Sequence, residues 1–166
     1  MAEARVEEIL NYLPIDGRLS TAGQPSVEEL AALARAGYEV VINIALHDDA
    51  RYALPDEAGT VAALGMTYVD ILVQFGAPTE ADFHAFSRAM RAHEGQQMLV
   101  HCAANKRVTA FLGLYRVIEL QCELQWGAAQ AFAPMRDIWQ PNPVWAAFIA
   151  AMLAKADTRA DGVDSA

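Results

Sequence analysis

The chain has 166 residues, 54% apolar and 20% charged, which is enough apolar side chain for one folded core and excludes global disorder. Its 21 acidic residues against 12 lysines and arginines give a net charge of -9, so we expect no nucleic-acid partner and no anionic membrane partner. Two cysteines are too few for a disulfide scaffold. The acidic start of the chain lacks the layout of a signal peptide, and the longest apolar run, residues 144–154, is too short to span a bilayer. We therefore expect a cytoplasmic protein.

The first 37 residues predict a helix, a loop and a second helix. Residues 1–13 carry apolar side chains at helical spacing and predict a short helix. The segment 14–25 is rich in glycine and proline, so it predicts a loop or a short strand. Ser26 and Glu29 have the spacing of a capping box at the start of a helix, and Gly37 supplies its end.

Two strands and a helix follow. The run 39–45 is rich in valine and isoleucine and predicts a buried strand. It leads into the polar loop 47–49. Pro55 then starts a helix that Gly65 ends. Residues 67–73 predict the second strand.

The next segment repeats this alternation. Thr79, with Asp82 three positions later, predicts the capped start of a helix that ends at Gly95. Residues 97–101 predict a third buried strand, and the pattern is helical again over 107–123. Strands that alternate with helices indicate an α/β fold with a mostly parallel sheet.

The last third of the chain predicts helices and a tail. Residues 127–137 and 143–155 have helical patterns, whereas residues 157–166 are small, polar and acidic and predict a disordered tail. We expect one domain over residues 1–156.

Several other residue types favour structural roles. Cys122 is expected to be an inert thiol within a helix. The tryptophans are expected to pack in the core, and three of the four histidines lack partners at metal-ligand spacing, so no metal site is predicted; these residues are Trp126, Trp139, Trp145, His47, His84 and His93.

One cysteine follows a strand directly. Cys102 comes after the strand 97–101, and a short loop of small and basic residues then leads into a helix. Ligands bind beyond the carboxyl ends of strands in such sheets. Backbone N–H groups at a helix start hold anions, and the same field favours a thiolate nucleophile. Lys106 and Arg107 add positive charge, and arginine can grip a tetrahedral oxyanion through two parallel N–H bonds.

His101-Cys102, the small-residue loop and Arg107 resemble the signature of cysteine-based protein phosphatases. Gly23-Gln24-Pro25 before the first capped helix, followed by the strand segment Val41-Ile42-Asn43, resembles the bacterial phosphatase-like domain of the beta-lactamase hydrolase-like proteins. The resemblance runs from Leu19 to Leu120. It implies a three-layer phosphatase-like sandwich, with helices on both sides of a mostly parallel sheet. It also implies a phosphocysteine intermediate, no metal and no cofactor.

Two interpretations of the loop stay open. Most such phosphatases place five residues between cysteine and arginine, whereas four separate Cys102 from Arg107. Either the loop is one residue short, as in rhodanese-type sulfurtransferases and the phosphatase-like family, or Val108 stands where the arginine belongs. In the second case Thr109 is the hydroxyl that stabilises the leaving thiolate. Asn105 replaces a glycine that often has a positive φ, which asparagine tolerates. The expected phosphate-binding residues are Ala103, Ala104, Asn105, Lys106, Arg107 and Val108, with His101 and Thr109 in support.

The general acid is the third departure from the family pattern. A phosphate ester needs its leaving oxygen protonated, usually by an aspartate on a neighbouring loop. Residues 74–76, past the second strand, contain no carboxylate. Asp48, with Asp49 beside it past the first strand, is the substitute by position. Asp70 lies within a strand, and Asp82 is more simply a helix cap.

Three functions compete at this point. The first is a cysteine phosphatase of the tyrosine or dual-specificity type, in which Cys102 attacks phosphorus, Arg107 binds oxygens and Asp48 acts as the acid. The second is a sulfurtransferase with a persulfide on Cys102, because a shorter loop favours sulfur over the larger phosphate. The third is a pseudophosphatase that binds phosphorylated or other anionic ligands without turnover. Neither the natural substrate nor the oligomeric state can be inferred from the residues.

Overall fold

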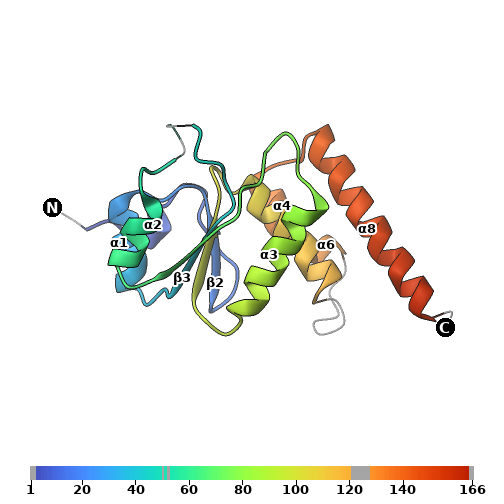
Figure 1. The fold of residues 1–166 in the computed structure, drawn as a ribbon, viewed down its shortest axis with the longest axis horizontal. Coiled ribbons are helices and arrows are strands. Elements are labelled where there is room, and N and C mark those ends of the chain that lie inside the picture. Colours follow the sequence, from blue (N-terminus) through green and yellow to red (C-terminus); the bar gives the residue numbers. More distant parts are fainter. Residues whose placement is uncertain (1–2, 50, 52, 121–127, 165–166) are drawn as a thin grey trace.

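The computed structural model describes residues 3–49, 51, 53–120 and 128–164 (Figure 1). In chain order its elements are a 3-10 turn η1 (Val6–Glu8), β1 (Leu13–Pro14), β2 (Leu19–Ala22), α1 (Val27–Arg35), β3 (Val40–Asn43), α2 (Glu57–Ala63), β4 (Thr67–Asp70), α3 (Glu80–Ala92), β5 (Met98–His101), α4 (Lys106–Ile118), α6 (Ala128–Ala131), α7 (Ala133–Ile138) and α8 (Pro143–Asp164). The predicted α/β class is confirmed.

The strands form one sheet in the order β1-β2-β5-β3-β4, in which only the β1–β2 pair is antiparallel. The last residues of the parallel strands lie in register: His101 pairs with both Ala22 and Asn43, and Asn43 pairs with Asp70. The four loops that follow these strands therefore begin at the same edge of the sheet. Because β5 is the central strand, Cys102 leaves the sheet at the middle of that edge.

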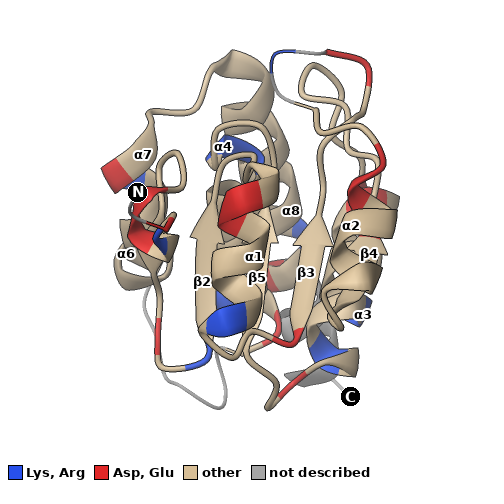
Figure 2. Ribbon diagram, turned by 90° about the vertical axis from the view of Figure 1, so that its left-hand side faces the viewer, with Lys and Arg blue, Asp and Glu red and all other residues tan. Residues whose placement is uncertain are grey.

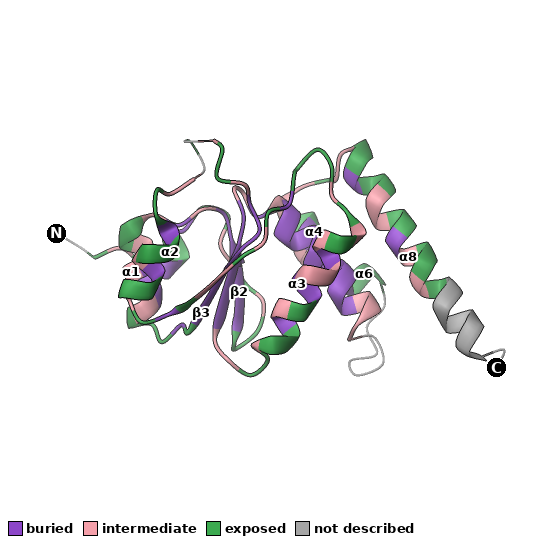
Figure 3. Ribbon diagram, in the orientation of Figure 1, coloured by how far each residue is buried: buried purple, intermediate pink, exposed green. Residues whose placement is uncertain are grey.

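Helices cover both faces of the sheet, so the molecule has three layers. In Figure 1, α1 and α2 lie on one side of the strands, and α3 and α4 lie on the other, with α8 outermost. Alternate strand side chains enter two separate apolar clusters. Val40, Ile42 and Val100 pack in the cluster that includes α3 and α4, whereas Val41 and Leu99 pack in the cluster that includes α1. The strands β2, β3 and β5 are buried on both faces (Figure 3), whereas the edge strand β4 is partly exposed. The apolar sequences of β3 and β5 reflect this burial.

Two capping boxes predicted from the sequence are confirmed. Ser26 Oγ accepts the N–H of Glu29 at 3.1 Å, and the Glu29 carboxylate accepts the N–H of Ser26 at 2.9 Å. Thr79 and Asp82 make the same reciprocal pair at the start of α3. Both helices begin at these positions because local side chains satisfy N–H groups that the helix leaves unpaired.

Two predicted helices are wrong in part. The helix predicted over residues 1–13 is only the three-residue turn η1, because Asn11 adopts a left-handed φ of 51° and the strand β1 follows. The helix predicted over 127–137 is divided between α6 and α7, which meet at Phe132. Pro134 in the first turn of α7 lacks the N–H that would continue the preceding helix.

The C-terminal helix continues past the predicted domain boundary. α8 extends to Asp164, so residues 157–164, for which the sequence predicts disorder, are helical. Alanine, which has the highest helix propensity, is the commonest residue of α8 as a whole. Cys122 and Trp126 lie outside the described residues. Trp145 is fully buried, as predicted, and Trp139 packs against the same core. Within the described ranges, no helix is both long enough and apolar enough to cross a membrane.

An aromatic cluster holds the α3, α4 and α8 layer together. The fully buried ring of Phe111 on α4 lies with its centroid 5.8 Å from that of Phe83, 5.5 Å from Phe86, 5.6 Å from Trp145 and 6.0 Å from Phe148. We expect Phe111→Ala to lower the free energy of unfolding by about 3–5 kcal/mol, since it removes a buried ring and leaves a cavity. Urea denaturation measures this loss.

Val144→Ala is the control, because Val144 is 46% exposed on the same helical layer. Its effect should stay within about 0.5 kcal/mol. Equal losses for the two variants would contradict the assignment of Phe111 as the centre of the cluster.

Candidate active site

Cys102 lies at the bottom of a small hollow at the carboxyl edge of the sheet. The side chain is 1% exposed. The thirteen-residue helix α4 begins at Lys106, so its N-terminal end and positive dipole face the loop that carries the cysteine. The hollow has a volume of about 280 Å³ and is lined by Asp49, Phe75, Cys102, Ala103, Ala104, Lys106 and Arg107.

The carbonyl groups of the loop are held by donors outside it. The backbone N–H of Gln24 donates to the carbonyl of Ala103 at 3.0 Å, and Asn11 Nδ2 donates to the carbonyl of Ala104 at 3.0 Å. In a trans peptide the C=O and the following N–H point in opposite directions. The N–H groups of Ala104 and Asn105 are thereby turned away from Gln24 and Asn11. Such oriented N–H groups form an anion-binding concavity.

Asn105 has the left-handed conformation expected of it, with φ at 66°. Its side chain is fully buried, and Nδ2 donates to the carbonyl of Asn11 and to Thr21 Oγ1, both at 2.9 Å. A glycine at this position would supply the same φ but neither hydrogen bond. Asn105 therefore both turns the loop and braces it against the segment around Asn11.

A close contact between two chain segments explains the glycine of the Gly-Gln-Pro motif, Gly23. It forms an isolated antiparallel bridge with Ala104. A Cβ atom on Gly23 would lie 2.6 Å from the carbonyl oxygen of Ala103 and 3.1 Å from the Cα of Ala104. These contacts are too short to form without movement of the backbone. Glycine is thus required here because the two chain segments approach so closely.

Of the two loop interpretations, the side-chain positions favour the short loop. Arg107 lines the hollow beside Cys102, whereas Val108 is fully buried in the apolar core. Arg107 Nη1 donates to the carbonyl of Val73 at 2.7 Å, and the guanidinium lies 5.6 Å from the centroid of the Phe75 ring. The guanidinium has five N–H groups, so this bond leaves others for an anion.

The side chains of Lys106 and Thr109, also predicted for the site, have different surroundings. Lys106 lines the hollow, with Nζ 5.7 Å from the centroid of the Trp139 ring. The hydroxyl of Thr109 is buried and lies 2.8 Å from the carbonyl oxygen of Asn105, to which it donates within the first turn of α4. It also donates to the carbonyl of Lys106 at 3.1 Å, so its hydrogen bonds run to backbone carbonyls and not to the thiol.

The structure separates the two candidate acids. Asp48 lines a different hollow, with Asp70 and Tyr68. Asp49 lines the hollow of Cys102 but is paired with Arg51, which donates from Nη2 at 2.8 Å and Nε at 3.1 Å. The hydrogen bonds and charge of Arg51 lower the pKa of Asp49, which keeps it a carboxylate at neutral pH.

The sequence alone did not indicate Glu57, the buried carboxylate behind the loop. Its side chain is 1% exposed, and its Oε2 lies 2.9 Å from Nε2 of His101 and accepts from Asn43 Nδ2 at 3.2 Å. Gln24 Nε2 donates to its other oxygen. Burial raises the pKa of Glu57, but the hydrogen bond and charge of His101, with hydrogen bonds from Gln24 and Tyr68, outweigh burial and bring this pKa below its usual value. In sequence Glu57 is indistinguishable from an ordinary acidic residue at a helix start.

His101 connects this carboxylate to Cys102. The ring is fully buried, and its Nδ1 lies 3.1 Å from the carbonyl oxygen of Cys102. A carbonyl and a carboxylate are both acceptors, so both contacts of the ring are hydrogen bonds only when both nitrogens carry a proton. The side chains of His101 and Glu57 are both buried, so solvent does not compete for these contacts.

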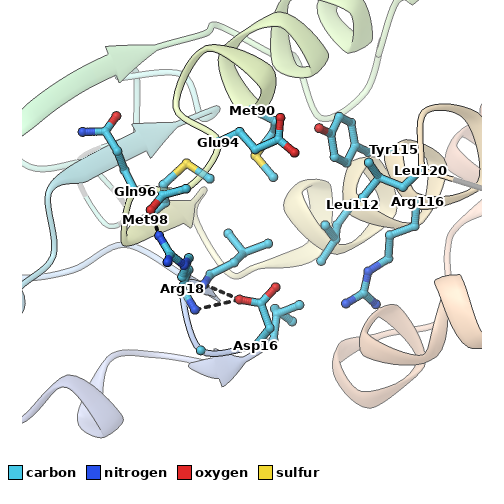
Figure 4. A pocket seen from close by; sticks show the side chains of 14 residues that line it. Asp16, Arg18, Met90, Glu94, Gln96, Met98, Leu112, Tyr115, Arg116 and Leu120 are labelled. Atoms are coloured by element: carbon cyan, nitrogen blue, oxygen red, sulfur yellow. Dashed lines mark hydrogen bonds between the residues drawn. The ribbon is translucent and has the colours of Figure 1, made fainter. Parts of the chain in front are cut away.

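A larger hollow, of about 550 Å³, lies at the opposite end of the parallel strands, beside the first residues of β2 and β5. Figure 4 shows it, with Asp16 and Arg18 on one side and Tyr115 and Arg116 on the other. This hollow has about twice the volume of the one beside Cys102, but it contains no residue of the cysteine loop. Among the described residues, no group of three or more His, Cys, Asp or Glu side chains is arranged to hold a metal ion.

Comparisons with known proteins agree with this geometry. No protein-family model matches the chain. Over 112 residues it is 33% identical to the beta-lactamase hydrolase-like protein of Xylella fastidiosa; the match covers 66% of this chain and 26% of that protein, so the chain spans about a quarter of its length. Among solved structures, a phosphatase-like protein (DUF442) from Shewanella putrefaciens CN-32 is 33% identical, with a TM-score of 0.79 over 91% of this chain and 96% of its own.

The fold likeness extends to more distant phosphatases. PTPMT1, solved in complex with PI(5)P, is 18% identical, with a TM-score of 0.70 over 90% of this chain and 98% of its own. At this identity the likeness concerns the fold alone. The three-layer sandwich is therefore that of the cysteine-based protein tyrosine phosphatases, as the sequence predicts.

We expect Gly23→Ala to weaken sulfate binding and to lower stability by about 1–3 kcal/mol, because the added methyl must push the loop backbone away. Calorimetric titration with sulfate and thermal unfolding measure the two effects. Gly17→Ala is the matched control, since its Cβ would meet nothing within 4 Å. Unchanged sulfate affinity in folded Gly23→Ala would show that the close approach does not shape the anion site.

Proposed function

Because the chain belongs to the DUF442 family of phosphatase-like proteins, we propose that it is a cysteine-dependent phosphatase that acts through a phosphocysteine intermediate. The observation that carries the proposal is that Cys102 and Arg107 line one hollow above the N-terminus of α4. A thiolate nucleophile, a guanidinium and oriented N–H groups are the parts that phosphoryl transfer from an ester needs.

In the proposed first step, the Cys102 thiolate attacks phosphorus and the bond to the ester oxygen breaks. The loop N–H groups and Arg107 bind the three phosphoryl oxygens that do not leave, and the departing alkoxide takes a proton from solvent. In the second step, water attacks phosphorus, the S–P bond breaks and inorganic phosphate and the thiolate are released. No cofactor takes part, and the substrate is a phosphorylated or similarly anionic molecule.

The proposed mechanism works without a positioned general acid. Phe75, not a carboxylate, faces the hollow from the segment after β4, and Asp49 is held ionised by Arg51. Asp48, the acid expected from its position in the chain, lines another hollow. Leaving groups therefore depart largely unprotonated in this proposal, and the activity is selective for good leaving groups.

One observation favours a second candidate function. Only four residues separate Cys102 from Arg107, and the hollow is small. A sulfane sulfur is smaller than a phosphoryl group, so a sulfurtransferase with a Cys102 persulfide fits the same loop. In that reaction the thiolate takes the outer sulfur of thiosulfate and releases sulfite, and cyanide then takes the sulfur as thiocyanate.

Cys102→Ser separates these functions. We expect the wild-type protein to hydrolyse an aryl phosphate and Cys102→Ser to lose that turnover, because a neutral hydroxyl is a poor nucleophile at this position. Colorimetric release of the aryl alcohol measures the rate. Formation of thiocyanate from thiosulfate and cyanide without phosphatase turnover would instead support sulfur transfer. Silence in both assays, with sulfate still protecting the thiol from alkylation, would support a non-catalytic anion-binding protein.

Arg107→Ala should weaken anion binding far more than Lys106→Ala. A charged, geometrically matched hydrogen bond contributes about 1.5–3 kcal/mol, whereas a partly exposed point charge contributes about 1 kcal/mol or less. Competition of sulfate or vanadate with aryl phosphate hydrolysis measures both affinities. An equal loss, or a larger loss for Lys106→Ala, would contradict the short-loop interpretation.

The rate should depend steeply on the leaving group. A positioned acid contributes about 10²–10⁴-fold, so without one an activated aryl phosphate should react far faster than an alkyl phosphate. A series of aryl phosphates of graded phenol acidity measures the slope. If Asp49→Asn or Asp48→Asn removes most of the rate on poor leaving groups alone, that aspartate is the acid and this prediction is wrong.

A further inference from the structure

Glu57 lies where the segments behind the cysteine loop converge. It begins α2, and its carboxylate contacts Gln24 after β2, Asn43 at the end of β3 and His101 at the end of β5. Asn43 Nδ2 also donates to the hydroxyl of Tyr68 on β4, at 3.0 Å. One buried carboxylate therefore joins residues that follow or end three strands, and Asn43 links it to β4.

We propose that Glu57 is a positioning residue for the cysteine loop: through His101 it holds the Cys102–Ala103 peptide in the orientation that presents an N–H to a bound anion. The inference rests on the proposed function, since it describes how the same loop is prepared for an anionic substrate.

The His101 ring transmits the effect. Glu57 holds Nε2 at 2.9 Å, which leaves Nδ1 directed at the carbonyl of Cys102 at 3.1 Å. With the Cys102 carbonyl held on the side of His101, the N–H of Ala103 points the opposite way. It joins the N–H groups of Ala104 and Asn105, whose preceding carbonyls are held by Gln24 and Asn11.

The charge of Glu57 matters as well as its shape. A neutral imidazole carries one N–H and can donate to only one of its two acceptors, whereas the doubly protonated ring donates to both. The buried carboxylate is what makes that charged ring tolerable in the interior. Two titratable groups lie beside the Glu57–His101 pair. Tyr68 on β4 faces Glu57, and Cys102 contacts the His101 ring through its backbone carbonyl.

Glu57→Gln tests the proposal, because it keeps the size of the side chain and removes the charge. We expect the pH profile of Cys102 alkylation by iodoacetamide, followed by mass spectrometry, to move to higher pH. The sulfate concentration that protects Cys102 should rise about 10-fold to 100-fold. This is the scale of the loss when the carboxylate partner of a metal-binding histidine is removed in other proteins. With an aryl phosphate, kcat should fall by a similar factor. Glu57→Asp keeps the charge and should restore part of the alkylation profile.

Glu28→Gln is the matched control, since it makes the same chemical change on an exposed residue of α1. It should move none of these readouts. A folded Glu57→Gln with the wild-type alkylation profile and sulfate protection would overturn the proposal and leave Glu57 as a stabilising residue only.

A measurement on the unaltered protein covers the case in which Glu57→Gln does not fold. Nitrogen-15 NMR of the histidine rings should show protons on both nitrogens of His101 at neutral pH, and a ring with one proton would overturn the proposal. The alkylation and NMR readouts need no turnover. If the protein hydrolyses no phosphate ester, the proposed function fails while these two readouts still decide the role of Glu57.

Discussion

The orientation of three consecutive peptide groups is the constraint on which this site depends. The carbonyls of Cys102, Ala103 and Ala104 are each bound from outside the loop, by a side chain, a backbone N–H and a second side chain. Planarity of the peptide then sends the three following N–H groups the other way. The glycine at position 23 and the left-handed Asn105 are the local conditions that let the loop reach this arrangement.

The candidate site is locally positive, although the chain as a whole is acidic. The protein has a net charge of -9, yet the start of α4 combines Lys106, Arg107 and a helix dipole. Figure 2 shows this basic segment, while the first turns of α1 and α2 and the loop around Asp49 are acidic. An anion is therefore favoured at this point, although the chain as a whole is acidic. Behind that point, the buried carboxylate of Glu57 lies 2.9 Å from the ring of the histidine that supports the loop.

The segment after β4 presents an aromatic ring to the hollow. Where a general acid would face the substrate, the segment after β4 presents the ring of Phe75, whose backbone carbonyl accepts the indole N–H of Trp145 at 2.7 Å. The same segment holds Arg107 through the carbonyl of Val73. The segment from which a general acid would donate a proton therefore serves instead to pack Phe75 and to hold Arg107. In the proposed mechanism, the site therefore provides for binding of the anion better than for protonation of the leaving group.

Local chemistry and tertiary contacts determined different parts of this protein. The sequence by itself determined the capped start of α1 by Ser26 and Glu29, the doubly buried strands, the position of Cys102 at a strand end and the positive φ of Asn105, because each depends on residues within a few positions. It did not reveal the pairing of His101 with Glu57, 44 residues away, or which of two adjacent aspartates lines the hollow. Those outcomes depend on strand order and on burial, which bring distant segments to one edge of the sheet. Local patterns carry no record of such contacts, so only the tertiary structure decided them.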